Sequence, residues 1–173
     1  RINGFLNPIG GDHMRIAVYC GAHLGADPAY LAAAKELGQW IVENNHELIY
    51  GGSRLGLMGV VADSVLAGNR KVIGIMPKFL QDTERIHTGL TEMITVNDLD
   101  ERKKALMQHS DVCLALPGGV GTLEEISEAF SWARVGQNNN PCIFFVSKED
   151  RQLVLFSDSL SAIDTFIHNY YAK

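Results

Sequence analysis

The sequence has few cysteines, no long apolar run and only a small excess of charge, and each absence excludes a class of protein. Its 173 residues include 3 cysteines. These form no CxxC pair, so neither a disulfide framework nor a structural zinc site is expected. No apolar run reaches the roughly 18 residues of a membrane-spanning helix. The net charge of -5 gives no long-range attraction to nucleic acid or acidic lipid. We therefore predict no metal, no nucleic-acid partner and no membrane partner.

The cysteines and the first residues indicate where the protein resides and where its domain begins. Cys20, Cys113 and Cys142 each lie within or at the end of an apolar run, which is typical of buried free thiols in a reducing compartment. We predict a cytoplasmic protein. Residues 1–13 have no signal-peptide pattern and are interpreted as a leader from cloning, with Met14 as the native start. Residues 14–173 are predicted to form one α/β domain.

Apolar segments that fit strands alternate with segments that fit helices. Asp27 and Pro28 have the residue types of an N-cap and a first helical position. Leu123, Ile126, Phe130 and Ala133 recur at helical spacing and predict one core-facing stripe. Short apolar strands between amphipathic helices predict a Rossmann-like α/β fold, a doubly wound parallel sheet with helices on both faces. The expected strands are 15–20, 47–50, 71–76, 92–96, 111–116 and 142–146; the expected helices are 27–44, 58–67, 99–109, one after the loop 117–122, and 159–170.

Three of the expected strands end in glycine-rich segments. They are CGAHLG at 20–25, YGGSRLGLMG at 50–59 and LPGGVGTLEE at 116–125. The carboxyl ends of parallel strands meet at one edge of a sheet, and ligands bind beyond that edge. We therefore expect the three segments to lie together and to form a binding site.

The glycine spacing does not fit the common nucleotide fingerprints. After Gly119 and Gly121, the position of the third glycine of a dinucleotide motif is Glu124, whose carboxylate would repel a pyrophosphate. The GxxxxG frame of segment 51–56 is followed by Leu-Met and not by the Lys-Ser/Thr pair of a P-loop. Two interpretations remain for the segment PGGVGT: a plain tight turn, or a turn that presents free N–H groups to a single phosphate.

The adjacent carboxylates of Glu124 and Glu125 also have two interpretations. Acidic residues in the first turn of a helix are stabilised by the helix dipole. Alternatively, one of them faces a ligand group that becomes positive, as the sugar does during N-glycosidic cleavage. A nucleoside monophosphate carries both a phosphate and such a bond. We therefore expect the glycines to hold the phosphate and an acid to face the ribose.

The segment PGGVGTLEE resembles the PGGxGTxxE motif of the LOG (Lonely Guy) family, the cytokinin riboside 5′-monophosphate phosphoribohydrolases, many of which carry the label lysine decarboxylase-like. The resemblance extends over about residues 15–145 and includes LIYGGSRLGLMG, VIGIMP and ERIHTGLTEMITVNDLDERKKALM. It implies hydrolysis of a purine nucleoside 5′-monophosphate, of the cytokinin type or AMP, to free base and ribose 5-phosphate. It also implies a homodimer with active sites near the subunit interface, and no cofactor.

The resemblance assigns roles to individual positions. Arg102 and Glu125 match the catalytic arginine and glutamate of the family. His87 is either a ligand contact or a capping or core residue. The positions that the resemblance places at the substrate are Glu84, Lys103, Gly118, Gly119, Val120, Gly121, Thr122, Leu123, Glu124, Gly51, Gly52 and Ser53.

Three departures from the family pattern bear on affinity and length. Ala22 stands where many members have serine, and Ser53 where a third glycine is common. After Phe145 the chain runs directly to SKEDRQLVLFSD, without the tyrosine-containing helix that the family usually places there. Two other functions stay open. One is a non-catalytic nucleotide or cofactor carrier on the same fold. The other is lysine decarboxylation, although no lysine has a recognisable pyridoxal phosphate context.

Overall fold

A computed structural model describes residues 13–81, 85–145 and 159–171. Its centre is a six-stranded sheet in the order β4-β3-β2-β1-β5-β6, and every strand pair is parallel. The strands are β1 (Arg15–Tyr19), β2 (Glu47–Tyr50), β3 (Val72–Pro77), β4 (Glu92–Val96), β5 (Val112–Ala115) and β6 (Cys142–Phe144). The strand order confirms the predicted doubly wound, Rossmann-like fold.

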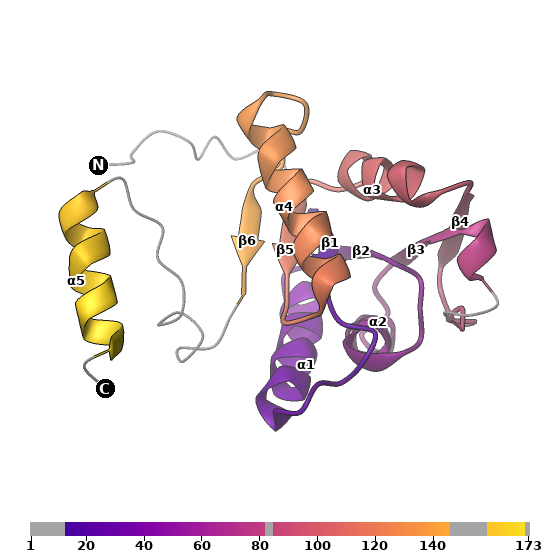
Figure 1. Cartoon of the computed structure of the whole chain (residues 1–173). Helices are drawn as coiled ribbons and strands as arrows, with labels where there is room; N and C mark the ends of the chain where they lie inside the picture. Colours follow the sequence, from indigo (N-terminus) through magenta and orange to yellow (C-terminus); the bar gives the residue numbers. More distant parts are fainter. Residues whose placement is uncertain (1–12, 82–84, 146–158, 172–173) are drawn as a thin grey trace.

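Helices cover both faces of the sheet (Figure 1). Residues of α1 and α2 share one core cluster with Ile16 and Val18 of β1. Residues of α3 and α4 share the other with Ala17 and Tyr19 of the same strand. Successive residues of β1 thus alternate between two cores, as burial on both faces requires. The helices are α1 (Pro28–Glu43), α2 (Gly56–Ala67), the short 3-10 helix η1 (Lys78–Leu80), α3 (Leu99–Gln108), α4 (Val120–Arg134) and α5 (Leu160–Tyr171).

The predicted start of α1 is confirmed in detail. Asp27 is its N-cap and Pro28 is its first residue. The Asp27 carboxylate accepts a hydrogen bond of 2.8 Å from the backbone N–H of Ala29, and so satisfies a donor that the helix start would otherwise leave unpaired.

The core-facing stripe predicted for α4 is wrong in two of its members. Leu123 is 63% exposed and Phe130 is 55% exposed, whereas Ile126 is buried. The buried residues of this helix are Thr122, Ile126 and Ala129. The helix is apolar on two sides, so spacing alone does not reveal which side faces the sheet. The second apolar stripe lies on the outer surface of the single chain.

The prediction that segment 142–146 is a buried strand is also only partly correct. β6 pairs with β5 in the expected place, but it lies at the sheet edge, and Ile143 and Phe144 are exposed. Cys20 and Cys113 are buried as predicted, whereas Cys142 is only partly buried. Val146 lies outside the described residues.

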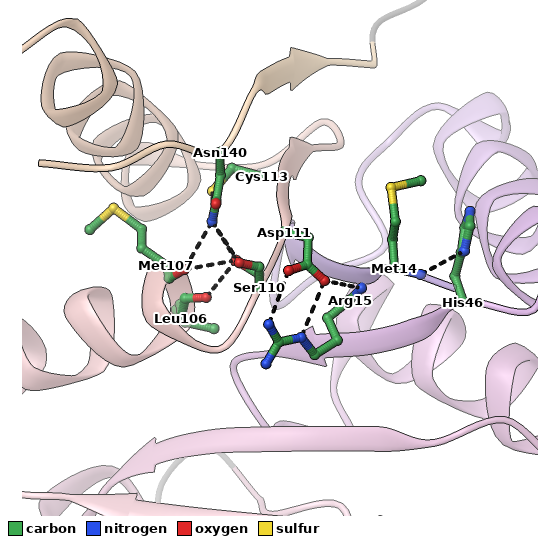
Figure 2. A network of polar contacts seen from close by, with 9 residues as sticks. All are labelled: Met14, Arg15, His46, Leu106, Met107, Ser110, Asp111, Cys113 and Asn140. Atoms are coloured by element: carbon green, nitrogen blue, oxygen red, sulfur yellow. Dashed lines mark hydrogen bonds and ion pairs between the residues drawn. The ribbon is translucent and has the colours of Figure 1, made fainter. Parts of the chain in front are cut away.

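Side chains tie the elements together at the amino-terminal edge of the sheet (Figure 2). Arg15 and Asp111, at the starts of β1 and β5, form an ion pair of 3.0 Å. The Asn140 amide donates to the carbonyls of Met107 and Ser110, both at 2.9 Å, and so binds the carboxyl end of α3 to the segment before β6. This edge is fixed by specific polar contacts.

α5 stands apart from the sheet, beyond β6 (Figure 1). None of the helices within 13–81, 85–145 and 159–171 is both long enough and apolar enough to cross a membrane. In the same ranges, no three His, Cys, Asp or Glu side chains are grouped so that they could hold a metal ion.

Candidate active site

A cavity lies at the carboxyl edge of the sheet, where the chain reverses direction. From β1 the chain builds β2, β3 and β4 on one side, and then returns to place β5 on the other side of β1. The loops after β1 and β5 therefore diverge and leave a crevice, which is where sheets of this kind bind ligands. The cavity has a volume of ≈ 450 Å³, and Gly21, Gly51 and Gly118 from the three glycine-rich segments line it. The predicted convergence of these segments is confirmed.

The start of α4 forms one wall of the cavity. Gly119 is the N-cap and has no side chain that could cap the helix. The first N–H groups of a helix lack intrahelical partners and carry the positive end of its dipole, so they suit an anion. A side chain on Gly118 would collide with Thr122, whereas a Cβ on Gly119 or Gly121 would meet nothing within 4 Å. At Gly119 and Gly121 the missing side chain therefore leaves open space beside the helix start.

Arg102 projects from α3 into the bottom of the cavity, where only 7% of the residue is exposed. Its Nε donates to the Ile75 carbonyl at 3.1 Å, and its Nη2 donates to the Gly51 carbonyl at 2.9 Å. A Cβ on Gly51 would collide with the same Nη2. Gly51 therefore contributes to the site in two ways: its carbonyl accepts a hydrogen bond from the guanidinium group, and its lack of a side chain leaves space for that group.

Glu125 reaches the same cavity from α4, whereas its neighbour Glu124 does not line it. Because α4 already begins at Val120, both glutamates lie in its second turn, and the first turn holds no acidic residue. The interpretation that they stabilise the first turn through the helix dipole is therefore wrong. The structure brings Arg102 and Glu125 together in one cavity and turns Lys103 and Glu124 away from it.

The other positions assigned by resemblance are distributed around the site. Val120, Gly121 and Thr122 line the cavity, but Leu123, Gly52 and Ser53 do not. Gly52 has a positive φ of 81°, a conformation that favours glycine. Ser53 is fully buried, and its hydroxyl accepts a hydrogen bond of 3.1 Å from the N–H of Leu55. Both residues thus shape the loop behind the site.

Two predicted positions precede β4 in the sequence. Glu84 falls outside the described residues. The ring of His87 accepts from the N–H of Gly89 at 3.0 Å and contacts the Asp63 carboxylate at 2.9 Å. It does not line the cavity, which agrees with the capping alternative and not with the ligand contact.

Several cavity residues were not assigned individual roles from the sequence, although some lie in the predicted glycine-rich segments. Tyr30 and Met58 come from the first turns of α1 and α2. Met58 lies within the glycine-rich segment 50–59 and Tyr30 lies five residues after the segment 20–25, so both had an available signal. Tyr19 and Cys20 form part of the inner wall. Burial raises the pKa of the Cys20 thiol and of the Tyr19 hydroxyl well above their usual ranges. Both groups are therefore neutral at physiological pH, and the cysteine is not poised as a nucleophile.

The site combines features that suit a small anionic ligand. Its volume of ≈ 450 Å³ lies within the range of about 300–1,000 Å³ that is usual for small-molecule sites. One wall offers backbone N–H groups at a helix start, and the interior offers a guanidinium group and a carboxylate. Such an arrangement can hold a phosphate and stabilise positive charge that develops nearby.

Comparison with known proteins identifies the family. Residues 58–171 match the model of a family described as possible lysine decarboxylase. The chain is 37% identical to the cytokinin riboside 5′-monophosphate phosphoribohydrolase of Rhodococcoides fascians over 88% of its length and 77% of that protein. It is 43% identical to the phosphoribohydrolase LOG1 of Arabidopsis thaliana over 73% of its length, but this match spans only 60% of the plant protein.

Solved structures support the fold. The molybdenum cofactor carrier protein of Chlamydomonas reinhardtii aligns with a TM-score of 0.65, over 92% of this chain and 98% of that one, at 20% identity. DNA processing protein A of Helicobacter pylori aligns with a TM-score of 0.53 at 14% identity, over 78% of this chain and 66% of that one. Identities this low indicate a shared fold only. The sequence relationships are closer, and on their strength the chain belongs to the LOG family, that of the cytokinin riboside 5′-monophosphate phosphoribohydrolases.

Proposed function

We propose that the protein hydrolyses the N-glycosidic bond of a purine nucleoside 5′-monophosphate, with AMP and cytokinin riboside monophosphates as the candidate substrates. The observation that carries the proposal is that Arg102 and Glu125 line one cavity together with the uncapped start of α4. The relatives named cytokinin riboside 5′-monophosphate phosphoribohydrolases support the same reaction.

In this proposal the phosphate binds at the start of α4, against the N–H groups of Gly119, Val120 and Gly121. The ribose then extends into the cavity toward Glu125. As the bond between C1′ and the base nitrogen breaks, its electron pair goes to the base and C1′ gains oxocarbenium character. The Glu125 carboxylate stabilises this charge or takes a proton from the water that attacks C1′. The hydroxyl of the water stays on C1′ and its proton passes to the base nitrogen, so the products are the neutral free base and ribose 5-phosphate.

Arg102 positions Glu125 and balances charge at the phosphate or at the leaving base. Its own position is fixed by the carbonyls of Ile75 and Gly51. A group held in this way needs little reorganisation during the reaction, which is the basis of electrostatic catalysis. No cofactor enters this reaction, since water is the only co-substrate.

A homodimer with the active sites near its interface is the proposed assembly. The outer stripe of α4 exposes Val120 at 89%, together with Leu123 and Phe130. Val120, Leu123 and Phe130 are three and seven residues apart, so they share one face of the helix. Val120 also lines the cavity. A second copy packed on this stripe would bury it and would lie directly beside the site.

Incubation with a panel of nucleoside monophosphates and their nucleosides, followed by chromatography of the released base, tests the proposal. We expect base release from AMP or a cytokinin riboside monophosphate, and much slower release from the nucleosides, because phosphate binding energy helps to assemble the transition state. Equal rates on nucleoside and nucleotide would contradict the role of the helix start. Binding of a nucleotide without base release would favour the carrier function, and an absorbance band near about 420 nm would favour a pyridoxal Schiff base and lysine decarboxylation.

A further inference from the structure

The carbonyl that accepts from the guanidinium group of the cavity belongs to Gly51, and the loop that carries it is supported by a second segment of the chain. Ser53 and Ile86 form an antiparallel bridge between the loop and this segment. Beside the bridge, the backbone N–H of His87 donates a hydrogen bond of 3.0 Å to the carbonyl of Gly52. The residue directly after Gly51 is therefore held from outside the loop.

The ring of His87 fixes the supporting segment. Its Nδ1 accepts a hydrogen bond of 3.0 Å from the N–H of Gly89, so the ring proton lies on Nε2. Nε2 faces the Asp63 carboxylate of α2 at 2.9 Å. The imidazole side chain is 11% exposed, whereas that of Asp63 is 74% exposed. The contact with Asp63 is therefore weak, and the turn that the ring closes onto Gly89 is the main restraint.

The same loop also rests on β3. A Cβ on Gly74 would lie 2.8 Å from the Cα of Gly52, which is too close for a side-chain carbon, so the two backbones are in direct contact. Arg102 donates to the next residue of β3, Ile75, and to Gly51 on the loop. The two carbonyls that hold Arg102 therefore keep their spacing only while the loop remains in contact with β3.

We propose that His87 is a positioning residue, whose ring and N–H keep the loop against β3 and so hold the Gly51 carbonyl where it fixes Arg102. The inference rests on the proposed hydrolase function, because His87 acts on the reaction through Arg102. His87 does not line the cavity, so it acts without touching the substrate. A shift of about 1 Å in a reacting group can lower a rate about 100-fold.

His87→Ala removes the acceptor for Gly89 and leaves the backbone N–H in place. We expect kcat for AMP to fall about 10-fold with KM within about 3-fold, since the guanidinium group is displaced but not removed. His87→Asn should restore most of the loss, because an asparagine side chain can accept from the N–H two residues further on. An unchanged kcat in His87→Ala overturns the inference, and so does an equal loss in both variants.

His46→Ala is the matched control. The His46 ring also accepts from a backbone N–H, that of Met14 at 3.2 Å, and His46 is buried. This contact lies at the amino-terminal edge of the sheet, away from the cavity (Figure 2). The control should lower the melting temperature and leave kcat unchanged. If kcat falls in both variants in proportion to their melting temperatures, His87 is only structural and the inference is overturned.

Combination with Arg102→Ala shows whether His87 acts through the guanidinium group. Adding His87→Ala to Arg102→Ala should cause no further fall in kcat, because the group that His87 positions is already absent. A further fall as large as that in the single variant would show a separate role for His87 and overturn the inference.

Crystal structures of the parent and of His87→Ala separate this inference from the proposed function. The hydrogen bond from Arg102 Nη2 to the Gly51 carbonyl is 2.9 Å in the parent, and we expect it to exceed about 3.5 Å in the variant. An unchanged bond overturns the positioning role even if the parent hydrolyses AMP. Absence of base release by the parent overturns the proposed function, and a displaced guanidinium group in the variant would still support the role of His87 in placing it.

Discussion

The two edges of the central sheet are built in different ways. At the amino-terminal edge, polar side chains form contacts within the chain: Arg15 forms an ion pair with Asp111, and the Asn140 amide donates hydrogen bonds to backbone carbonyls at the end of α3 (Figure 2). At the carboxyl edge, glycines leave backbone groups uncovered around a cavity. The first edge is closed by polar contacts within the chain, and the second is open to a ligand.

One helix, α3, contributes residues to both edges of the sheet. α3 is bound by Asn140 at its carboxyl end and presents Arg102 near its amino end. Variants at the open edge change groups that line the cavity and should alter catalysis more than stability. Variants at the closed edge remove contacts far from the cavity and should alter stability more than catalysis.

The largest effect is expected at Arg102 and Glu125, the pair proposed to be catalytic. Glu125→Gln keeps the size of the side chain but removes its charge, and we expect kcat to fall about 10²–10³-fold or more. Arg102→Ala should be similarly damaging, and the double variant little worse, since the two groups act as a unit. Steady-state kinetics of base release from AMP measures this. Turnover close to that of the parent in either single variant would mean that the roles are wrongly assigned.

Gly51→Ala tests whether the position of Arg102 depends on an absent side chain. The new methyl group would displace the guanidinium group, which is the end of a flexible side chain, so the fold should persist. We expect a fall in kcat of about 100-fold, the size of effect that misplaced catalytic groups produce. Thermal melting provides the control. A variant that melts like the parent and hydrolyses AMP at the same rate would show that the guanidinium does not need this position.

Gly119→Ala separates the role of this loop in binding from its role in folding. Gly119 has a φ of -87°, so alanine causes no backbone strain there, and its methyl group would enter the open cavity. We expect about a 10-fold increase in KM for AMP with little change in melting temperature. Ribose 5-phosphate should raise the melting temperature of the parent but not of the variant. An equal shift in both proteins would place the phosphate elsewhere.

The smallest effect is expected at the closed edge. The hydrogen bonds from Arg15 lower the pKa of Asp111 in the folded protein. This contact therefore contributes stability that is complete above the unfolded pKa of about 3.9 and is lost as the pH falls through the lower folded pKa. Asp111→Asn should lose at most about 1 kcal/mol at neutral pH, because the pair is partly exposed. Denaturant unfolding between about pH 2 and pH 7 should show a weaker acid dependence in the variant, with base release unchanged. A large loss of activity would contradict the division between the two edges.

Much of the fold could be predicted from the sequence because its signals are local. Apolar strand runs, the cap formed by Asp27 and Pro28, and the glycine segments that end the strands all depend on neighbours along the chain. Their order predicted a doubly wound sheet and the edge at which a ligand would bind. The burial of α4 could not be predicted in this way, since Leu123 and Ile126 have similar chemistry and only packing distinguishes them.

The sequence by itself determined the alternation of strands and helices, the doubly wound fold class and the family, because motifs preserve residue type and spacing. The tertiary structure decided how each pair of adjacent charges divides. Arg102 turns inward because the carbonyls of Gly51 and Ile75 meet it there, and Lys103 turns outward because Glu124 and Glu128 meet it on α4. Two adjacent charged residues cannot be told apart from the sequence alone, whereas the side chains of consecutive helical residues point about 100° apart. Which of two adjacent charges enters the site is therefore settled only when the helices pack.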